Sequence, residues 1–115
     1  VVDDAAAQRQ IASRILEKLG YVVATASSGE AAVAYVKENA VDLLVLDMIM
    51  DPGIDGLETY RQVIARRPGQ KAIIASGFSE NDRVREAQRL GASRYVKKPY
   101  TLESIGRAVK AALAS

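Results

Sequence analysis

The chain has 115 residues, which is enough for one hydrophobic core but not for two. Hydrophobic residues make up 49% and charged residues 26%, as in ordinary globular domains, and the net charge of +2 is too small to favour nucleic acid or a membrane surface. No apolar run approaches the roughly 20 residues of a membrane helix, and no signal peptide is visible. We therefore expect residues 1–115 to form a single cytoplasmic domain that contacts neither nucleic acid nor a membrane.

Cysteine and histidine are both absent from the sequence. The lack of cysteine excludes disulfides and thiol chemistry. The lack of histidine excludes the commonest general base, the Ser-His-Asp arrangement and most zinc sites. Any chemistry of this chain must therefore use Asp, Glu, Ser, Thr or Lys, with or without a hard metal ion.

Strands and helices alternate along the chain. Short apolar runs predict strands at residues 1–2, 21–25, 41–46, 71–75 and 93–96, the first being the end of a strand that begins before this sequence. Helical spacing predicts helices at residues 8–19, 29–39 and 57–67. Two more helices end near residues 90 and 113, and Ser79 and Thr101 could cap them as Ser28 could cap the second. Five such units predict an α/β fold with a parallel sheet and helices on both faces.

Polar side chains follow four of the predicted strands. Asp47 ends the apolar run 41–46, which has the composition of a strand buried on both faces. Asp3 and Asp4 follow the first strand, Ser76 the fourth and Lys98 the fifth. The carboxyl ends of the strands of a doubly wound sheet converge on one crevice, so we expect these side chains to form one site.

These residue types favour phosphoryl chemistry with a metal ion. Three crowded carboxylates repel one another unless a cation lies between them, and oxygen ligands without histidine or cysteine suit Mg²⁺ or Mn²⁺. A serine hydroxyl and a lysine ammonium can hold the oxygens of a phosphoryl group. An aspartate can itself be the nucleophile and form an aspartyl phosphate. Each residue taken alone has a plainer interpretation, such as turn capping for Asp47.

Four segments together resemble the motif set of two-component response-regulator receiver domains: Asp3-Asp4, the loop 47–56, the turn 75–77 and the segment 95–100. They occur in the family's order with nearly its spacing and cover essentially the whole chain. The resemblance implies a flavodoxin-like, doubly wound five-stranded parallel sheet of order 2-1-3-4-5 with five helices.

The resemblance also assigns roles at the acidic site. Asp47 is the expected phosphoacceptor and a metal ligand. Asp4 is expected to bind Mg²⁺ directly, Asp3 to bind it through a water molecule, and Ile49 to contribute its backbone carbonyl.

The same resemblance assigns the remaining polar groups. Ser76 is expected to donate a hydrogen bond to the phosphoryl group, and Lys98 to pair with its charge. Tyr95 is expected to be an aromatic switch that follows the movement of Ser76. Packing in the sheet is an equally common role for an aromatic residue on an edge strand, so both interpretations of Tyr95 stay open.

The loop after Asp47 departs from the family pattern. It is one residue longer than usual, which displaces Asp51 and Pro52 but not Ile49. A longer loop of this kind resembles receivers attached to hybrid sensor histidine kinases. We therefore expect a receiver that takes a phosphoryl group from a histidine kinase, or from its phosphorylated histidine domain, and switches conformation to relay a two-component signal.

Two alternatives stay open, and a third is disfavoured. The chain could be a stand-alone single-domain response regulator, or a pseudo-receiver that binds proteins without switching. A phosphohydrolase of the haloacid-dehalogenase type is disfavoured because position 49 is Ile and not Asp. The domain alone would catalyse only its own phosphorylation and dephosphorylation. The family also implies a possible homodimer through the face made by the fourth helix, fifth strand and fifth helix.

Overall fold

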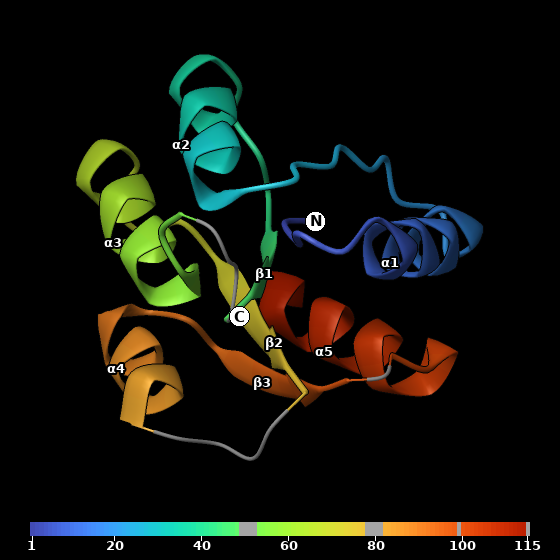
Figure 1. The fold of residues 1–115 in the computed structure, drawn as a ribbon. Helices are drawn as coiled ribbons and strands as arrows, with labels where there is room; N and C mark the ends of the chain where they lie inside the picture. The colour runs from blue at the N-terminus through green and yellow to red at the C-terminus, as the bar shows by residue number, and fades with distance from the viewer. Residues whose placement is uncertain (49–52, 78–81, 99, 115) are drawn as a thin grey trace.

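The computed structural model describes residues 1–48, 53–77, 82–98 and 100–114 (Figure 1). In these residues the elements are α1 (Ala6–Lys18), α2 (Gly29–Glu38), β1 (Leu44–Asp47), α3 (Gly56–Arg66), β2 (Ala72–Ser76), α4 (Asp82–Leu90), β3 (Arg94–Lys97) and α5 (Leu102–Ala114). Helices thus occupy all five predicted places, with small shifts at their ends. None of the helices in this part of the chain is long and apolar enough to cross a membrane.

The strands form a parallel sheet in the order β1-β2-β3. Val2 extends the sheet beyond β1 because it makes parallel bridges to Leu46 on one side and to Ala26 on the other. The spatial order is therefore the segment at Ala26, the segment at Val2, β1, β2 and β3. This is the predicted flavodoxin-like order 2-1-3-4-5, and it confirms the fold class.

The predicted strand at residues 21–25 is not formed; this edge of the sheet pairs only at Ala26. A strand requires a ladder of hydrogen bonds, and the bonds from this edge to the segment at Val2 are made at Ala24 and Ala26. The amino group of Val1 donates a hydrogen bond to the Ala24 carbonyl (2.9 Å), and the Val1 carbonyl accepts one from the Ala26 N–H (2.9 Å). The sheet therefore has three full strands and two bridged segments among the described residues.

A hollow of about 620 Å³ lies on the amino-terminal side of Val2. Its walls include residues 20–26 on one side and 40–45 on the other, and apolar side chains such as Leu16, Val36 and Val109 line it. The backbones at Ala26 and Leu46 flank Val2, so they lie two strand spacings apart, roughly 9.5 Å. The hollow is therefore about one strand wide.

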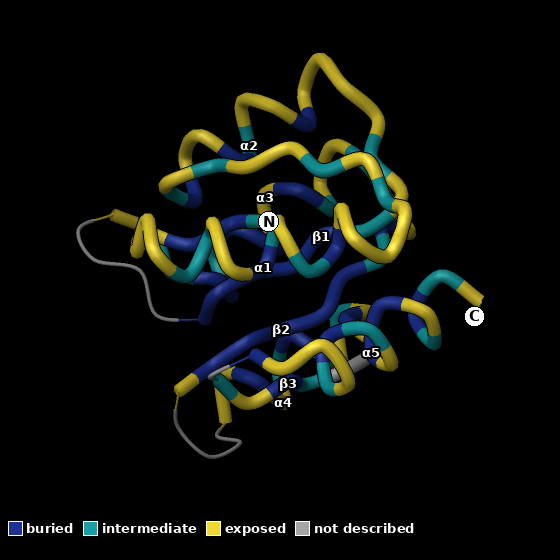
Figure 2. Tube along the Cα trace, turned by 90° about the vertical axis from the view of Figure 1, so that its right-hand side faces the viewer, coloured by how far each residue is buried: buried dark blue, intermediate teal, exposed yellow. Residues whose placement is uncertain are grey.

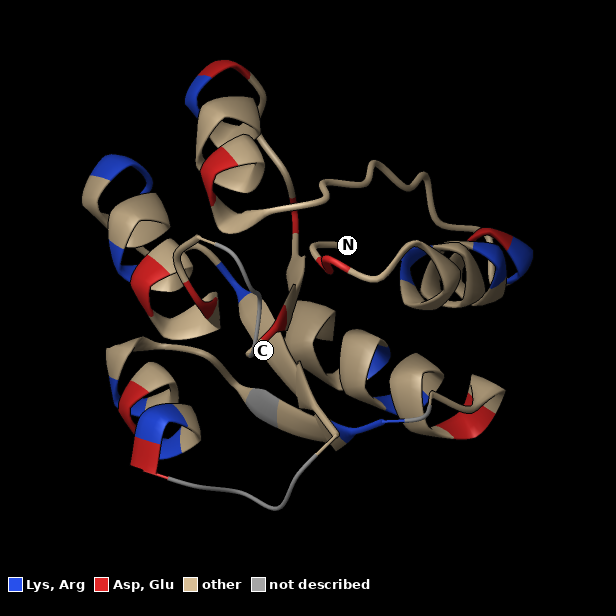
Figure 3. Ribbon diagram, in the orientation of Figure 1, with Lys and Arg blue, Asp and Glu red and all other residues tan. Residues whose placement is uncertain are grey.

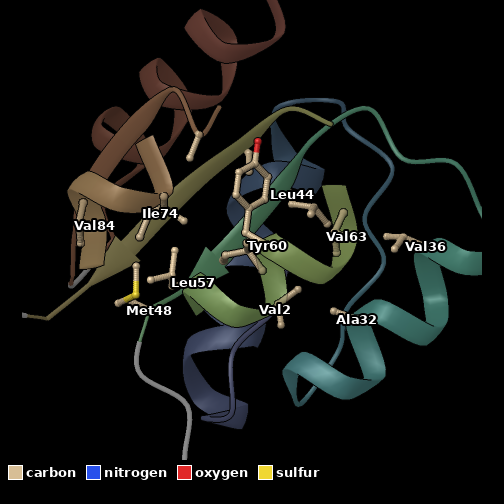
Figure 4. Packing of buried hydrophobic residues seen from close by; sticks show 14 residues of the cluster. Val2, Ala32, Val36, Leu44, Met48, Leu57, Tyr60, Val63, Ile74 and Val84 are labelled. Carbon is tan, nitrogen blue, oxygen red and sulfur yellow. The ribbon is translucent and has the colours of Figure 1, made fainter. Parts of the chain in front are cut away.

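Helices cover both faces of the sheet, as predicted. One core contains Leu46 and Ile74 with side chains from α2, α3 and α4, and the other contains Val45 and Ile73 with side chains from α1 and α5. In Figure 4, Leu57, Tyr60 and Val63 of α3 lie between the sheet and the neighbouring helices. Every residue of β1 and β2 is buried, which confirms a central parallel strand ending at Asp47 (Figure 2).

Side-chain caps set the start of three helices. The Ser28 hydroxyl accepts a hydrogen bond from the Ala31 N–H (3.0 Å) at α2, and the Thr101 hydroxyl accepts one from the Ser104 N–H (2.9 Å) at α5, both as predicted. The Asp55 carboxylate accepts from the Glu58 N–H (2.9 Å) at α3. Ser79, the predicted cap of the fourth helix, lies outside the described residues.

An apolar extension added ahead of Val1 is expected to enter the hollow as a central strand. A short extension of alternating Val and Ile should raise the melting temperature by several degrees, because burying a few such side chains contributes on the order of 1.5–3 kcal/mol each before entropy costs. Backbone amides at residues 21–25 should gain protection in hydrogen-exchange mass spectrometry. An extension of Ser, Asn and Gly is the matched control; equal protection from both extensions would contradict the interpretation.

Candidate functional site

The predicted site residues meet at the carboxyl edge of the sheet. Asp47 ends β1, Ser76 ends β2, Asp3 follows the bridge at Val2, and Lys98 directly follows β3. The Lys98 ammonium lies 2.6 Å from Asp3 Oδ2 and 3.0 Å from Asp47 Oδ1. Figure 3 shows acidic residues both at the start of the chain and at the end of β1. Side chains from the two ends of the sequence are therefore in direct contact.

Every polar atom of Asp3 takes part in a hydrogen bond. Its side chain is fully buried; Oδ1 accepts a hydrogen bond from the Ala5 N–H (2.9 Å) and Oδ2 accepts one from Lys98. Its backbone N–H donates to the Ala26 carbonyl (3.1 Å), and its carbonyl accepts from Arg9 Nη1 (2.7 Å). This residue is therefore fixed in place before any ligand binds.

Asp3, Asp4 and Asp47 form a cluster of carboxylates. One oxygen from each lies within 4.8 Å of the others; Asp3 and Asp47 are buried and Asp4 is exposed. The pKa of Asp47 is raised to about 6, chiefly by burial; the charges of Asp3 and Asp4 also raise it, while the hydrogen bond and the charge of Lys98 lower it. A buried carboxylate that resists ionisation beside two others fits a hard divalent cation with oxygen ligands.

Lys98 supplies the positive charge of the site. Burial lowers its pKa, but the hydrogen bonds with Asp3 and Asp47 and the charges of the two carboxylates together outweigh burial and raise the pKa above its usual range. Its backbone N–H donates to the Ser76 carbonyl (2.8 Å), and its ammonium lies 6.0 Å from the centre of the Tyr100 ring. The ammonium is therefore a fixed charge at neutral pH.

Ser76 and Tyr95 lie on one face of the sheet. Register pairs Ile74 with Tyr95 and Ser76 with Lys97, and side chains two residues apart on a strand share a face. That face is the one covered by α3 and α4, against which Tyr95 is half-buried. Ser76 itself is 1% exposed. This shared face is compatible with a switch but also with simple packing, so the role of Tyr95 stays a prediction.

The loop after Asp47 is described from Gly53 onward. Ile49, expected to offer its backbone carbonyl to the metal, lies outside the described residues, as do Asp51 and Pro52. Beyond them, the Ile54 N–H donates to Glu30 Oε2 (3.2 Å), which ties the loop to the first turn of α2.

α3 begins directly against the backbone of Asp47. The Gly56 N–H donates to the Met48 carbonyl (2.9 Å). A Cβ atom at Gly56 would lie 2.4 Å from the Asp47 carbonyl oxygen and 2.9 Å from Met48 Cα. Only glycine allows this close approach, so the start of α3 positions the end of β1.

Three charged residues near the site were not predicted from the sequence. Arg9 bonds the Asp3 carbonyl, Glu30 holds the loop, and Arg83 of α4 pairs with Asp55 at 2.5 Å. Each is a charged residue in a helix, and such residues are usually solvated. No spacing in the sequence distinguishes them from their neighbours, because their partners come from other elements.

A doubly wound sheet with buried carboxylates and a lysine at its carboxyl edge defines a class of domain that can hold a cation beside a buried aspartate. Residues 1–110 match the response regulator receiver domain, and the chain belongs to this family. Receiver domains are phosphorylated by histidine kinases or phosphotransferases, and they generally bind Mg²⁺ through acidic residues.

Relatives with curated names share about a third of their residues with this chain. Sporulation initiation phosphotransferase F of Bacillus subtilis is 32% identical over 110 residues, covering 96% of this chain and 88% of that protein. Chemotaxis protein CheY of Thermotoga maritima is 34% identical over 101 residues, covering 87% and 83%. Transcriptional regulatory protein ZraR of Salmonella typhimurium is 34% identical over 114 residues, covering 99% of this chain but 26% of that protein.

Solved structures show the same fold. The N-terminal domain of a response regulator/sensory box/GGDEF protein from Carboxydothermus hydrogenoformans aligns with a TM-score of 0.89 at 30% identity, covering 98% of this chain and 90% of that one. The receiver domain of NtrX from Brucella abortus aligns with a TM-score of 0.92 at 25% identity, covering 99% and 96%.

Replacing Gly56 by Ala is expected to lower the free energy of unfolding by about 1–3 kcal/mol, because the new methyl group overlaps the Asp47 backbone. Gly106→Ala is the matched control. Its Cβ would lie 3.2 Å from Leu19 Cδ1, the end of an exposed and flexible side chain, and alanine favours the interior of α5 by up to about 1 kcal/mol. Urea unfolding measures both; equal stability of the two variants would contradict the close approach.

The stability of the metal-free protein should fall as pH rises through about 6. Asp47 has a folded pKa of about 6 against 3.8 unfolded, so the folded state holds the proton more tightly, and this contribution is present below 3.8 and lost as pH passes about 6. Asp47→Asn cannot ionise. The unfolding free energy of this variant should equal that of the wild type near pH 4 and exceed it by up to about 3 kcal/mol near pH 8.

Urea unfolding in EDTA at a series of pH values measures this difference. Asp42→Asn, at an exposed aspartate outside the carboxylate cluster, is the control and should not reproduce the gain. A constant gap between Asp47→Asn and wild type from pH 4 to pH 8 would show that ionisation of Asp47 is not the cause.

Proposed function

We propose that this chain accepts a phosphoryl group on Asp47 from a histidine kinase, or from its phosphorylated histidine domain, and relays a two-component signal. The supporting observation is the contact of the Asp47 carboxylate with Lys98 at 3.0 Å, inside a cluster of three carboxylates at the sheet edge. An Asp47 oxygen attacks phosphorus while the P–N bond of the donor phosphohistidine breaks and the imidazole leaves. The chain has no histidine, so the donor belongs to another domain or protein.

The residues that would hold Mg²⁺ are Asp4 and Asp47 directly, Asp3 through water, and the backbone carbonyl of Ile49. The indirect role of Asp3 is supported by its contacts, because Oδ1 and Oδ2 already accept hydrogen bonds from Ala5 and Lys98. Asp4 is exposed and thus reachable from solvent. When bound, the cation neutralises the charge that gathers on the transferred group.

Ser76 and Lys98 would hold the phosphoryl oxygens. Both are fixed by backbone geometry, since the Lys98 N–H donates to the Ser76 carbonyl. The added charge on Asp47 would bias two pre-existing conformations, with Ser76 and Tyr95 moving on the face covered by α3 and α4. The face made by α4, β3 and α5 would then serve a partner or a second copy of the chain.

The kind of protein that contains this domain is a separate proposal. We infer attachment to a hybrid sensor histidine kinase from the length of the loop after Asp47, with a stand-alone response regulator as the alternative. The relatives described above include proteins that this chain spans almost in full and proteins of which it covers 26%. A pseudo-receiver is disfavoured because Asp47, Ser76 and Lys98 are all present and converge.

Phosphorylation of Asp47 can be tested with a small donor. Acetyl phosphate with Mg²⁺ should add one phosphoryl group to the wild type and none to Asp47→Asn, as read by intact-protein mass spectrometry. Beryllofluoride with Mg²⁺ should shift the amide signals of Ser76 and Tyr95 in NMR spectra of the wild type only. Asp42→Asn, at the exposed aspartate, should behave as wild type; an unmodified wild type would refute the proposal.

A further inference from the structure

Arg9 is the charged side chain of α1 that reaches the acidic site. It lies in the second turn of the helix and is half-buried, and its Nη1 donates a 2.7 Å hydrogen bond to the backbone carbonyl of Asp3. That carbonyl belongs to the peptide joining Asp3 to Asp4. The guanidinium therefore fixes the plane of the peptide from which the exposed carboxylate of Asp4 projects.

Asp3 is the anchored end of this short segment, and the bond from Arg9 acts on the peptide that leads from Asp3 to Asp4. Residues 3–5 are in neither a strand nor a helix. Asp3 donates its N–H to Ala26, and the Ala5 N–H donates to the Asp3 side chain. α1 has no side-chain cap at Ala5 and no acidic residue in its first turn, so the helix does little by itself to order the turn before it.

We propose that Arg9 is a positioning residue for cation binding. It holds the Asp3–Asp4 turn so that the Asp4 carboxylate faces Asp47 before the cation arrives. This inference rests on the proposed function, because it concerns the affinity of the same site for Mg²⁺. Residues that orient metal ligands without touching the metal typically change affinity about 10–100-fold when they are replaced.

Charge alone predicts the opposite sign. Arg9 is a cation near a cation site, so its charge repels Mg²⁺, and removal of that charge without any loss of order would tighten binding. Loss of the hydrogen bond to Asp3 instead frees the turn and weakens binding. The direction of the change in affinity therefore separates positioning from electrostatics.

Arg9→Met is the decisive variant, because methionine keeps an apolar stem against the helix but has neither the guanidinium nor its charge. We expect its Mg²⁺ dissociation constant, measured by calorimetry on the whole chain, to rise about tenfold or more. Arg9→Lys keeps the charge without the planar fork and should lie between Arg9→Met and wild type. Arg14→Met, at an exposed arginine of the same helix, is the control and should bind as tightly as wild type or slightly more tightly.

A second measurement needs no metal. In Arg9→Met the amide of Ala5, bonded to Asp3 Oδ1, should exchange with solvent faster than in wild type and in Arg14→Met. Equal or tighter Mg²⁺ binding by Arg9→Met, or an unchanged Ala5 amide, would overturn the role of Arg9. A wild type that binds no Mg²⁺ would overturn the proposed cation site itself, and this inference with it.

Discussion

The contact of Lys98 with Asp3 and Asp47 is the interaction on which the site depends, and it joins residues 95 positions apart in the sequence. Two buried carboxylates side by side are unfavourable, since each loses hydration and repels the other. One ammonium between them satisfies both, while its own burial is compensated by the two hydrogen bonds. Removing the ammonium would leave both buried carboxylates without their cation, and loss of the charge that compensates a buried one typically costs about 3–5 kcal/mol.

The parallel sheet explains why such charges gather in one place. β1 and β2 are buried on both faces, so their interiors must be apolar and their polar residues must lie where the backbone leaves the sheet. All strands point the same way, so those ends meet at one edge. The apolar core and the acidic site are therefore two results of the same topology, and the start of α3 against Asp47 closes the arrangement from one side.

α4 packs on the sheet through small side chains. Among the described residues its buried side chains are Val84 and Ala87, which are small. These side chains lie in the same core as those of α3. Arg83 adds an ion pair with Asp55, the N-cap of α3, but the two side chains are 52% and 27% exposed, and pairs this accessible contribute little to stability. α4 covers the face of the sheet on which Ser76 and Tyr95 lie, which suits the switching role proposed for the domain.

The amino-acid sequence by itself determined the five helices, the parallel sheet and the group of acids, serine and lysine at strand ends. Periodicity and chain order carry this information, because each element buries its own apolar face and each strand end leads to the same edge. Only the tertiary structure decided that residues 21–25 form no strand and that this edge bridges Val2 at Ala26, since pairing depends on a segment distant in the sequence. It also decided the roles of Arg9, Glu30 and Gly56, whose partners lie in other elements and are set by packing in three dimensions.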